Sequence, residues 1–239
     1  MKKNRNRFIL SGLIVVAVVL APANLLAATN GFIIPSFRGA ADSQSGYWEN
    51  FTVPVGAPGN IPDQPGATTS AVLTQINPGA ILASGNIYNP ATSNAFVIAD
   101  APPFVLATVV LQTRTVGNPL DYNSTTLNYS DGSGAHSVAP LFRYELSLAD
   151  GGVSSLWQWD LTGLNVTSYT IAFNGSGPHV SLDAVTLDTA RQFSDAFPQQ
   201  PFKLQSQVSD LARWAYLASD FGLQTRATAS VFGALGDAP

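Results

Sequence analysis

From residue 47 to residue 187 the sequence is a succession of short runs rich in Val, Ile, Thr, Tyr and Phe, separated by Gly, Pro, Asn and Asp. Several runs alternate apolar and polar residues with a period of two; in residues 168–173, Tyr169, Ile171 and Phe173 share one face of a strand. No alternation of strands with helices accompanies them, which argues against a Rossmann or barrel enzyme. The pattern predicts an all-β fold, an antiparallel β-sandwich of the jelly-roll kind. The predicted strands are 47–53, 70–75, 81–88, 94–99, 104–112, 125–129, 140–148, 154–161, 168–174 and 179–187.

The first 28 residues have the features of a secretory signal peptide. Four basic residues precede an apolar run at 8–20, and small residues follow, so cleavage is expected after Ala23, Ala27 or Ala28. The apolar run is shorter than the roughly 20 residues that cross a bilayer as a helix. We therefore expect a secreted or cell-surface bacterial protein without a transmembrane segment in its mature chain, and an uncleaved N-terminal anchor is the alternative.

Charge and cysteine content exclude several functions. The whole chain has 11 Lys and Arg against 15 Asp and Glu, and four of the basic residues lie in the predicted signal peptide. The remaining 7 basic residues against 15 acidic ones give a mature charge of −8. This balance argues against a nucleic-acid partner, which would require clustered cations. The sequence contains no cysteine, which excludes thiol catalysis, cysteine-ligated zinc and iron–sulfur clusters.

The chain divides into a signal peptide at 1–28, a sandwich domain at 31–190 and a helical appendage at 191–239. In the appendage, residues 202–221 carry apolar residues at spacings of three and four, which predicts one amphipathic C-terminal α-helix. Such a helix could dock on the sandwich, or it could bind a protein partner. The apolar positions are Leu204, Val208, Leu211, Trp214, Leu217 and Phe221.

Asp183 stands inside the apolar strand pattern VSLDAVTL. A carboxylate among apolar neighbours requires a partner, which could be a calcium ion, Arg38, or solvent at a sheet edge. Calcium favours oxygen ligands from irregular loops, and such loops are expected at 39–45 and 128–134. The two histidines, His136 in a predicted turn and His179 at the start of a strand, fit no metal-site spacing.

Trp157 and Trp159 are two residues apart and project to the same side of a strand, and Trp48 lies in an early aromatic cluster. If exposed, these three side chains would form a flat stacking platform for sugar rings. If buried, they fill the sandwich core, which is the favoured interpretation.

Two segments, FRGAADSQSGYWENF and WQWDLTGLNVTSYTIAFNGSGPHVSLDAVTLDT, resemble exported bacterial proteins of the PEP-CTERM-associated kind. Those proteins often carry a galactose-binding-like jelly-roll domain similar to carbohydrate-binding modules. The resemblance covers residues 37–189 and does not include the family's C-terminal sorting motif. It implies that Asp183 matches an Asp that helps to hold a structural calcium, with Asp42 or nearby carbonyl groups as the place to look for further ligands.

The leading functional hypothesis is non-catalytic binding of extracellular or cell-surface carbohydrate. The second is a structural or assembly protein of the envelope or matrix that acts through residues 202–221. The third is a polysaccharide-active hydrolase, which would require two carboxyl groups converging in one cleft, and the mature chain contains only two glutamates, Glu49 and Glu145.

Overall fold

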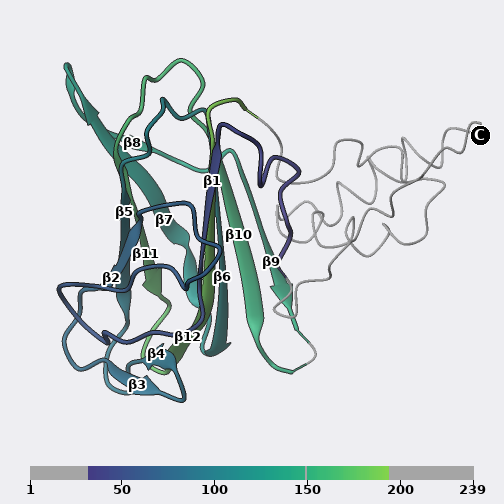
Figure 1. Ribbon diagram of the computed structural model, residues 1–239. Helices are drawn as coiled ribbons and strands as arrows, with labels where there is room; N and C mark the ends of the chain where they lie inside the picture. Colours follow the sequence, from purple (N-terminus) through teal and green to yellow (C-terminus); the bar gives the residue numbers. More distant parts are fainter. Residues whose placement is uncertain (1–31, 149, 194–239) are drawn as a thin grey trace, which may run out of the picture.

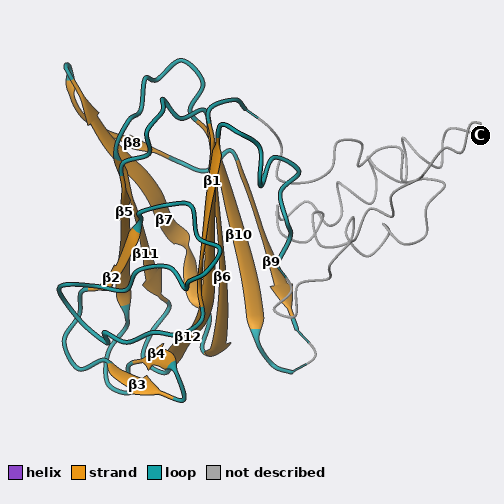
Figure 2. Ribbon diagram, in the orientation of Figure 1, coloured by secondary structure: helices purple, strands orange, loops and turns teal. Residues whose placement is uncertain are grey.

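The structure is a computed structural model that describes residues 32–148 and 150–193. Within these ranges a pair of antiparallel β-sheets face each other and there is no helix (Figures 1 and 2). The all-β prediction with two antiparallel sheets is therefore confirmed. The predicted signal peptide and the predicted helix at 202–221 lie outside the described residues.

The larger sheet has seven strands. Its order is β3 (Ile81–Ala83), β4 (Asn86–Tyr88), β12 (Val180–Ala190), β6 (Thr108–Gly117), β10 (Val153–Asp160) and β9 (Phe142–Ser147). The remaining strand, β1 (Ser43–Trp48), also pairs with β12, from Val185 to Ala190, whereas β4 pairs with β12 at Ser181 and Leu182. The long strands β12 and β6 thus form the middle of this sheet.

The smaller sheet has five strands, all antiparallel to their neighbours. Its order is β2 (Val72–Gln75), β5 (Ala95–Asp100), β11 (Tyr169–Gly175), β7 (Leu120–Asp131) and β8 (Gly134–Val138). The burial of β5, β7 and β11 alternates residue by residue, so one face of this sheet packs on the core and the other faces outward.

The structure corrects three local predictions. The predicted strand at 81–88 is the hairpin of β3 and β4, because Ser84 and Gly85 both adopt a positive φ and turn the chain. His136 lies in β8 and not in a turn, because residues 134–138 pair with β7. Ala184 does not share a face with Leu182, because a bulge in β12 between these two residues inserts one extra residue and reverses the alternation.

The main core lies between the sheets and is built largely from aromatic and branched side chains. Phe96 and Phe173 stack with their ring centroids 5.0 Å apart. Trp157 and Trp159 are each 0% exposed and their indole N–H groups donate to the backbone carbonyls of Tyr122 and Val138, so the polar atom of each ring is satisfied inside.

A second apolar cluster covers the outer face of the seven-stranded sheet. The N-terminal segment, residues 32–42, crosses this face and places Phe37 against Val110, Leu156 and Ala190. The side-chain amide of Gln112 holds this segment in place. It accepts a hydrogen bond from the backbone N–H of Ile33 and donates one to the carbonyl of Ile33, both at 2.7 Å. The N-terminal segment therefore shields part of a sheet face that would otherwise be exposed to solvent.

The same segment brings a cation to a buried carboxylate. The Arg38 guanidinium donates to both carboxylate oxygens of Asp188, at 2.5 and 2.6 Å, and the Asp188 side chain is 0% exposed. Burial raises the pKa of Asp188, and the charge and hydrogen bonds of Arg38 oppose that rise. The arginine that the sequence suggested for Asp183 serves Asp188 instead.

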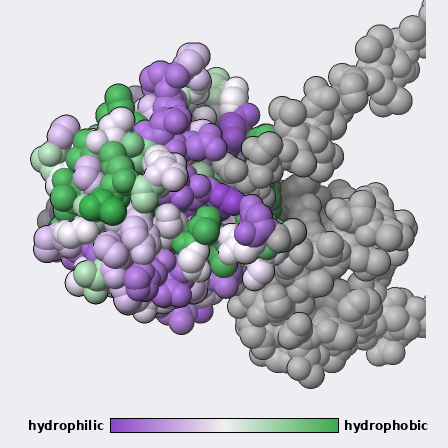
Figure 3. Space-filling model, turned by 90° about the horizontal axis from the view of Figure 1, so that it is seen from below, coloured by the Kyte–Doolittle hydropathy of each residue, from purple (hydrophilic) through white to green (hydrophobic). Residues whose placement is uncertain are grey.

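The end of the sandwich that carries β3 is partly apolar on its surface. Viewed from that end, apolar residues gather in one area within a largely polar surface (Figure 3). The exposed side chains of Ile81 and Leu82 belong to β3. Over the described ranges, no helix has the length and hydropathy that a membrane span requires.

Candidate functional site

Near the Asp100 end of β5, the outer face of the five-stranded sheet carries small, uncharged side chains. Next to the inward side chains of Ile171 and Leu127 the outward positions hold alanine, threonine or asparagine, and next to Phe96 they hold alanine and valine. The strand register aligns these outward residues in two rows that cross β5, β11, β7 and β8. One row is Ala99, Thr170, Asn128 and Ser137. The next is the pair of Ser130 and Ala135, which Ala101 and Ser168, the residues just beyond the ends of β5 and β11, extend.

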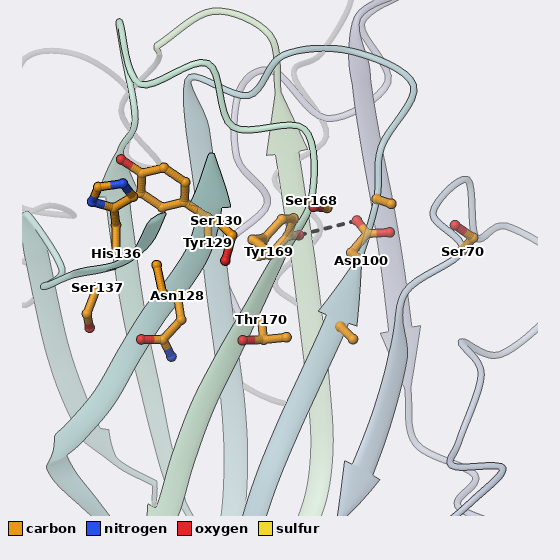
Figure 4. A pocket seen from close by; sticks show the side chains of 13 residues that line it. Ser70, Asp100, Asn128, Tyr129, Ser130, His136, Ser137, Ser168, Tyr169 and Thr170 are labelled. Atoms are coloured by element: carbon orange, nitrogen blue, oxygen red, sulfur yellow. Dashed lines mark hydrogen bonds between the residues drawn. The ribbon is translucent and has the colours of Figure 1, made fainter. Parts of the chain in front are cut away.

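Because both rows are built from small side chains, the face is hollowed there. The hollow is an open depression of about 750 Å³, with Ser70 at its margin next to β5. Figure 4 shows Ser137, Asn128 and Thr170 on adjacent strands, as the register requires. We call this feature the outer depression. Its outward side chains offer hydroxyl and amide groups and carry no charge.

The intervening residues of the same strands point to the interior. The carboxylate of Asp100 accepts from the hydroxyl groups of Thr69 at 3.1 Å and Tyr169 at 3.3 Å (Figure 4). Burial raises the pKa of Asp100, although these hydrogen bonds oppose the rise, and burial beside Asp100 raises the pKa of Tyr169 well above its usual value. Of the described residues that line the depression, only Asp100 carries a carboxyl group, and its side chain is buried on the inward side of β5.

His136 lies at the edge of the same region but does not form a catalytic triad. Its Nε2 lies 2.9 Å from Asp131 Oδ1 and 3.0 Å from Ser133 Oγ. A triad requires the acid on one ring nitrogen and the nucleophile on the other. Here both contacts use Nε2, and the His136 ring stacks on Tyr129 with centroids 4.9 Å apart. Hydrogen bonds from Ser133 and His136 hold the pKa of Asp131 far below its usual value, and the three residues lie together at the β7–β8 turn.

The three tryptophans proposed as ligand-binding residues are buried. Trp48 is 1% exposed, Trp157 and Trp159 are 0% exposed, and all three belong to the main core cluster. The indole N–H of Trp48 donates to the carbonyl of Asn60. The prediction that these residues form a stacking platform for sugars is therefore wrong, and the alternative, that they fill the core, is correct. The physical reason is that the strand face shared by Trp157 and Trp159 is the one that packs against the opposite sheet.

The two proposed calcium ligands lie far apart. Asp42 precedes Ser43, which pairs with Ala190 at one end of β12, whereas Asp183 is seven residues away along that strand. At about 3.3 Å per residue the separation is roughly 23 Å, so both cannot bind one ion. Asp183 instead forms an ion pair with Arg114, and Asp42 has the Arg191 guanidinium at 3.9 Å. No group of three or more metal-ligating side chains occurs in the described ranges, and calcium binding stays a prediction.

Sequence reasoning missed the outer depression. The signal was present in the outward positions of residues 168–172, which are Ser, Thr and Ala, but a single strand of this kind is common. Only the pairing of four strands shows that small residues meet at the same level across the sheet.

Comparisons with known proteins identify no family. No family model matches the chain, and no curated protein matches it. Among solved structures, a family GH115 4-O-methyl-alpha-glucuronidase with specificity for decorated arabinogalactans is similar over 44% of this chain and 14% of its own, with 14% identity and a TM-score of 0.26. The enzymatically active domain of bacteriophage CBA120 tailspike protein 4 is similar over 63% of this chain and 20% of its own, with 8% identity and a TM-score of 0.26.

The chain thus spans a fifth or less of either structure. Neither likeness assigns a family or an activity to this chain. What the described residues define is a two-sheet antiparallel β-protein with an uncharged depression on one outer face. Membership of the exported PEP-CTERM-associated group stays a prediction.

Proposed function

We propose that this chain is an exported, non-catalytic protein that binds neutral polysaccharide in the outer depression. The supporting observation is the chemistry of the two rows, where hydroxyl and amide groups occupy the middle, alanines lie at the ends, and none of the row residues is charged. Hydroxyl and amide groups both donate and accept hydrogen bonds, as sugar hydroxyls do. Among the described residues, the rows offer no cation to an anionic ligand, so a neutral glycan fits best.

The geometry also favours an extended ligand that crosses the strands. Each row passes over four strands, and neighbouring strands are about 4.8 Å apart, so a row is roughly 14 Å long. That length suits a short stretch of sugar chain. None of the outward row side chains carries a ring on which a sugar could stack, so affinity depends mainly on hydrogen bonds worth about 0.5–1.5 kcal/mol each. We expect a dissociation constant between about 0.1 and 1 mM for a short oligosaccharide, and tighter binding for a polymer with many sites.

The hydrolase alternative has less support from this site. Glycoside hydrolysis usually requires two carboxyl groups, about 5–9.5 Å apart, that flank the scissile bond. The lining of the outer depression contains one carboxyl group, that of Asp100, which is turned inward and bonded to Thr69 and Tyr169. A binding role therefore accounts for the described side chains better than catalysis does.

The test is a binding screen of the full chain against neutral and acidic polysaccharides, followed by isothermal titration with the best ligand. Ala99→Arg fills the depression with a long side chain, and Ala91→Arg makes the same change at an exposed turn between β4 and β5. We expect Ala99→Arg to weaken binding at least tenfold and Ala91→Arg to leave it unchanged, with native near-UV circular dichroism in both. Absence of binding to every neutral glycan, or equal effects of the two variants, would refute the proposal.

A further inference from the structure

The outer face of the seven-stranded sheet is more apolar than a face exposed to water should be. Val110 of β6 and Leu156 of β10 point outward, away from the main core, and are 0% and 1% exposed. Phe142 and Leu146 of β9 pack against this cluster from the edge of the sheet and are only partly buried. Sheets with one solvated face normally carry polar residues there. The face is therefore built for a covering layer.

The N-terminal segment supplies some of that layer. Phe37 and Arg38 lie over β12 and β6, and Ile33 is held above β6 by Gln112. The apolar surface extends beyond this segment toward β9. Phe142 and Leu146 lie on the outer side of β9, are only partly buried, and continue the apolar strip along that strand. A second covering element is needed above β9 and the adjacent edge of β10.

The chain leaves the sandwich close to this strip. Ala190, at the end of β12, pairs with Thr108, which pairs with Asp160 at the end of β10, and Phe142 of β9 pairs with Gln158. The exit point is thus three strand spacings from the start of β9, about 14 Å. Residues 194–201 can span more than about 25 Å when extended, which is ample.

We propose that residues 202–221 form an amphipathic helix that lies along β9 and β10 and covers this apolar strip. The apolar face of that segment includes Leu204, Leu211 and Trp214. Twenty helical residues are about 30 Å long, and the eight residues of β10 are about 26 Å long, so the helix and the strip match in length. The occupant is this chain's own segment because its attachment point is so near. This proposal does not depend on the proposed polysaccharide site, which lies on the other sheet.

Trp214 gives a direct test. The chain has four tryptophans, and the other three are buried in the main core, so Trp214 alone reports on the position of this segment. Acrylamide quenching is measured on the full chain at several concentrations, with Trp214→Phe to isolate its emission. Leu211→Asp places a charge on the apolar face, Ser209→Asp places the same charge on the opposite face, and Leu146→Asp changes the sheet side. Near-UV circular dichroism of the buried tryptophans checks that each variant keeps its core.

We expect Trp214 to be protected in the native chain at all concentrations. Leu211→Asp and Leu146→Asp should each raise the quenching constant of Trp214 several-fold, while Ser209→Asp leaves it unchanged. Protection that disappears on dilution would show that a second copy is the occupant and overturn the proposal. Free quenching of Trp214 in the native chain, or equal effects of Leu211→Asp and Ser209→Asp, would also overturn it. If Leu146→Asp loses its core signal, the milder Leu146→Ser replaces it on the sheet side. Unchanged quenching of Trp214 in a folded Leu146 variant would place the segment elsewhere and overturn the proposal.

Discussion

The buried ion pair between Arg38 and Asp188 offers the sharpest test of how this fold is held together. Replacing Arg38 with methionine keeps most of the side-chain volume but leaves the Asp188 carboxylate, 0% exposed, without its cation. Removing one partner of a buried pair typically costs about 3–5 kcal/mol, because the remaining charge is uncompensated. Since the Arg38 side chain is 28% exposed, water reaches the vacated position, and we expect a loss near the lower end, about 3 kcal/mol.

The assay is urea unfolding followed by the fluorescence of the buried tryptophans. For an m-value of about 2 kcal/mol/M, a loss of about 3 kcal/mol lowers the midpoint by roughly 1.5 M at about pH 7. The loss should depend on pH. Burial raises the pKa of Asp188 in the folded state, and without Arg38 nothing opposes that rise, so the folded variant holds a proton that the unfolded chain has released. The loss of unfolding free energy in Arg38→Met is therefore largest above the raised pKa of Asp188, and it shrinks as the pH falls toward about 4.

A double-mutant cycle measures the interaction between Arg38 and Asp188 directly. Asp188→Asn removes the charge that Arg38 compensates, so Arg38→Met together with Asp188→Asn should cost about 1–2 kcal/mol less than the sum of the single changes. Three results would each refute the reasoning: a loss below about 1 kcal/mol for Arg38→Met, the same loss at about pH 4 and pH 7, or strictly additive single changes. Any of them would mean that the N-terminal segment is not anchored by this pair.

Three further predictions concern other buried or paired side chains. Trp157→Ala should lower the free energy of unfolding by about 3–5 kcal/mol, measured by urea titration, because it empties a fully buried site in the core. Asp100→Asn should reduce the fall in stability of the native chain as the pH rises above about 4, measured as the change in midpoint with pH. An acid whose pKa is raised in the folded state stabilises that state only while protonated, and Asp188 and Glu145 still contribute to the fall. Asp183→Asn should lower stability by about 1 kcal/mol through loss of the ion pair with Arg114, equally with added calcium and with chelator. A loss seen only with calcium would instead make Asp183 a calcium ligand.

Much of the strand pattern could be read from the sequence because sheet side chains alternate with a fixed period. The inward face of β11, with Tyr169, Ile171 and Phe173, is the one that the alternation predicts. The absence of cysteine likewise agrees with a fold held by packing and ion pairs. The alternation failed in β12, where the bulge next to Asp183 changes the sidedness of every later residue, and a bulge leaves no mark in the order of residue types.

The candidate site was harder to predict for a different reason. Tryptophans two residues apart are compatible with either face of a strand, and the sequence cannot weigh them against the sheet that covers one face. The outer depression depends on residues from four strands that are up to 71 positions apart in the chain, such as Ala99 and Thr170. No local pattern connects them, since each strand alone shows only a few small residues facing outward.

The sequence by itself determined the all-β class, the sidedness of most strands and the exclusion of cysteine chemistry, because these depend on residue type and on a period of two. The tertiary structure alone decided which face of each strand is covered and which charges meet. Arg38 and Asp188 are 150 residues apart, and Arg114 reaches Asp183 across neighbouring strands. Such partnerships arise from strand pairing and from the layer that crosses the outer face, so the tertiary structure makes a carboxylate in a strand an ion-pair partner and places a tryptophan pair in the core.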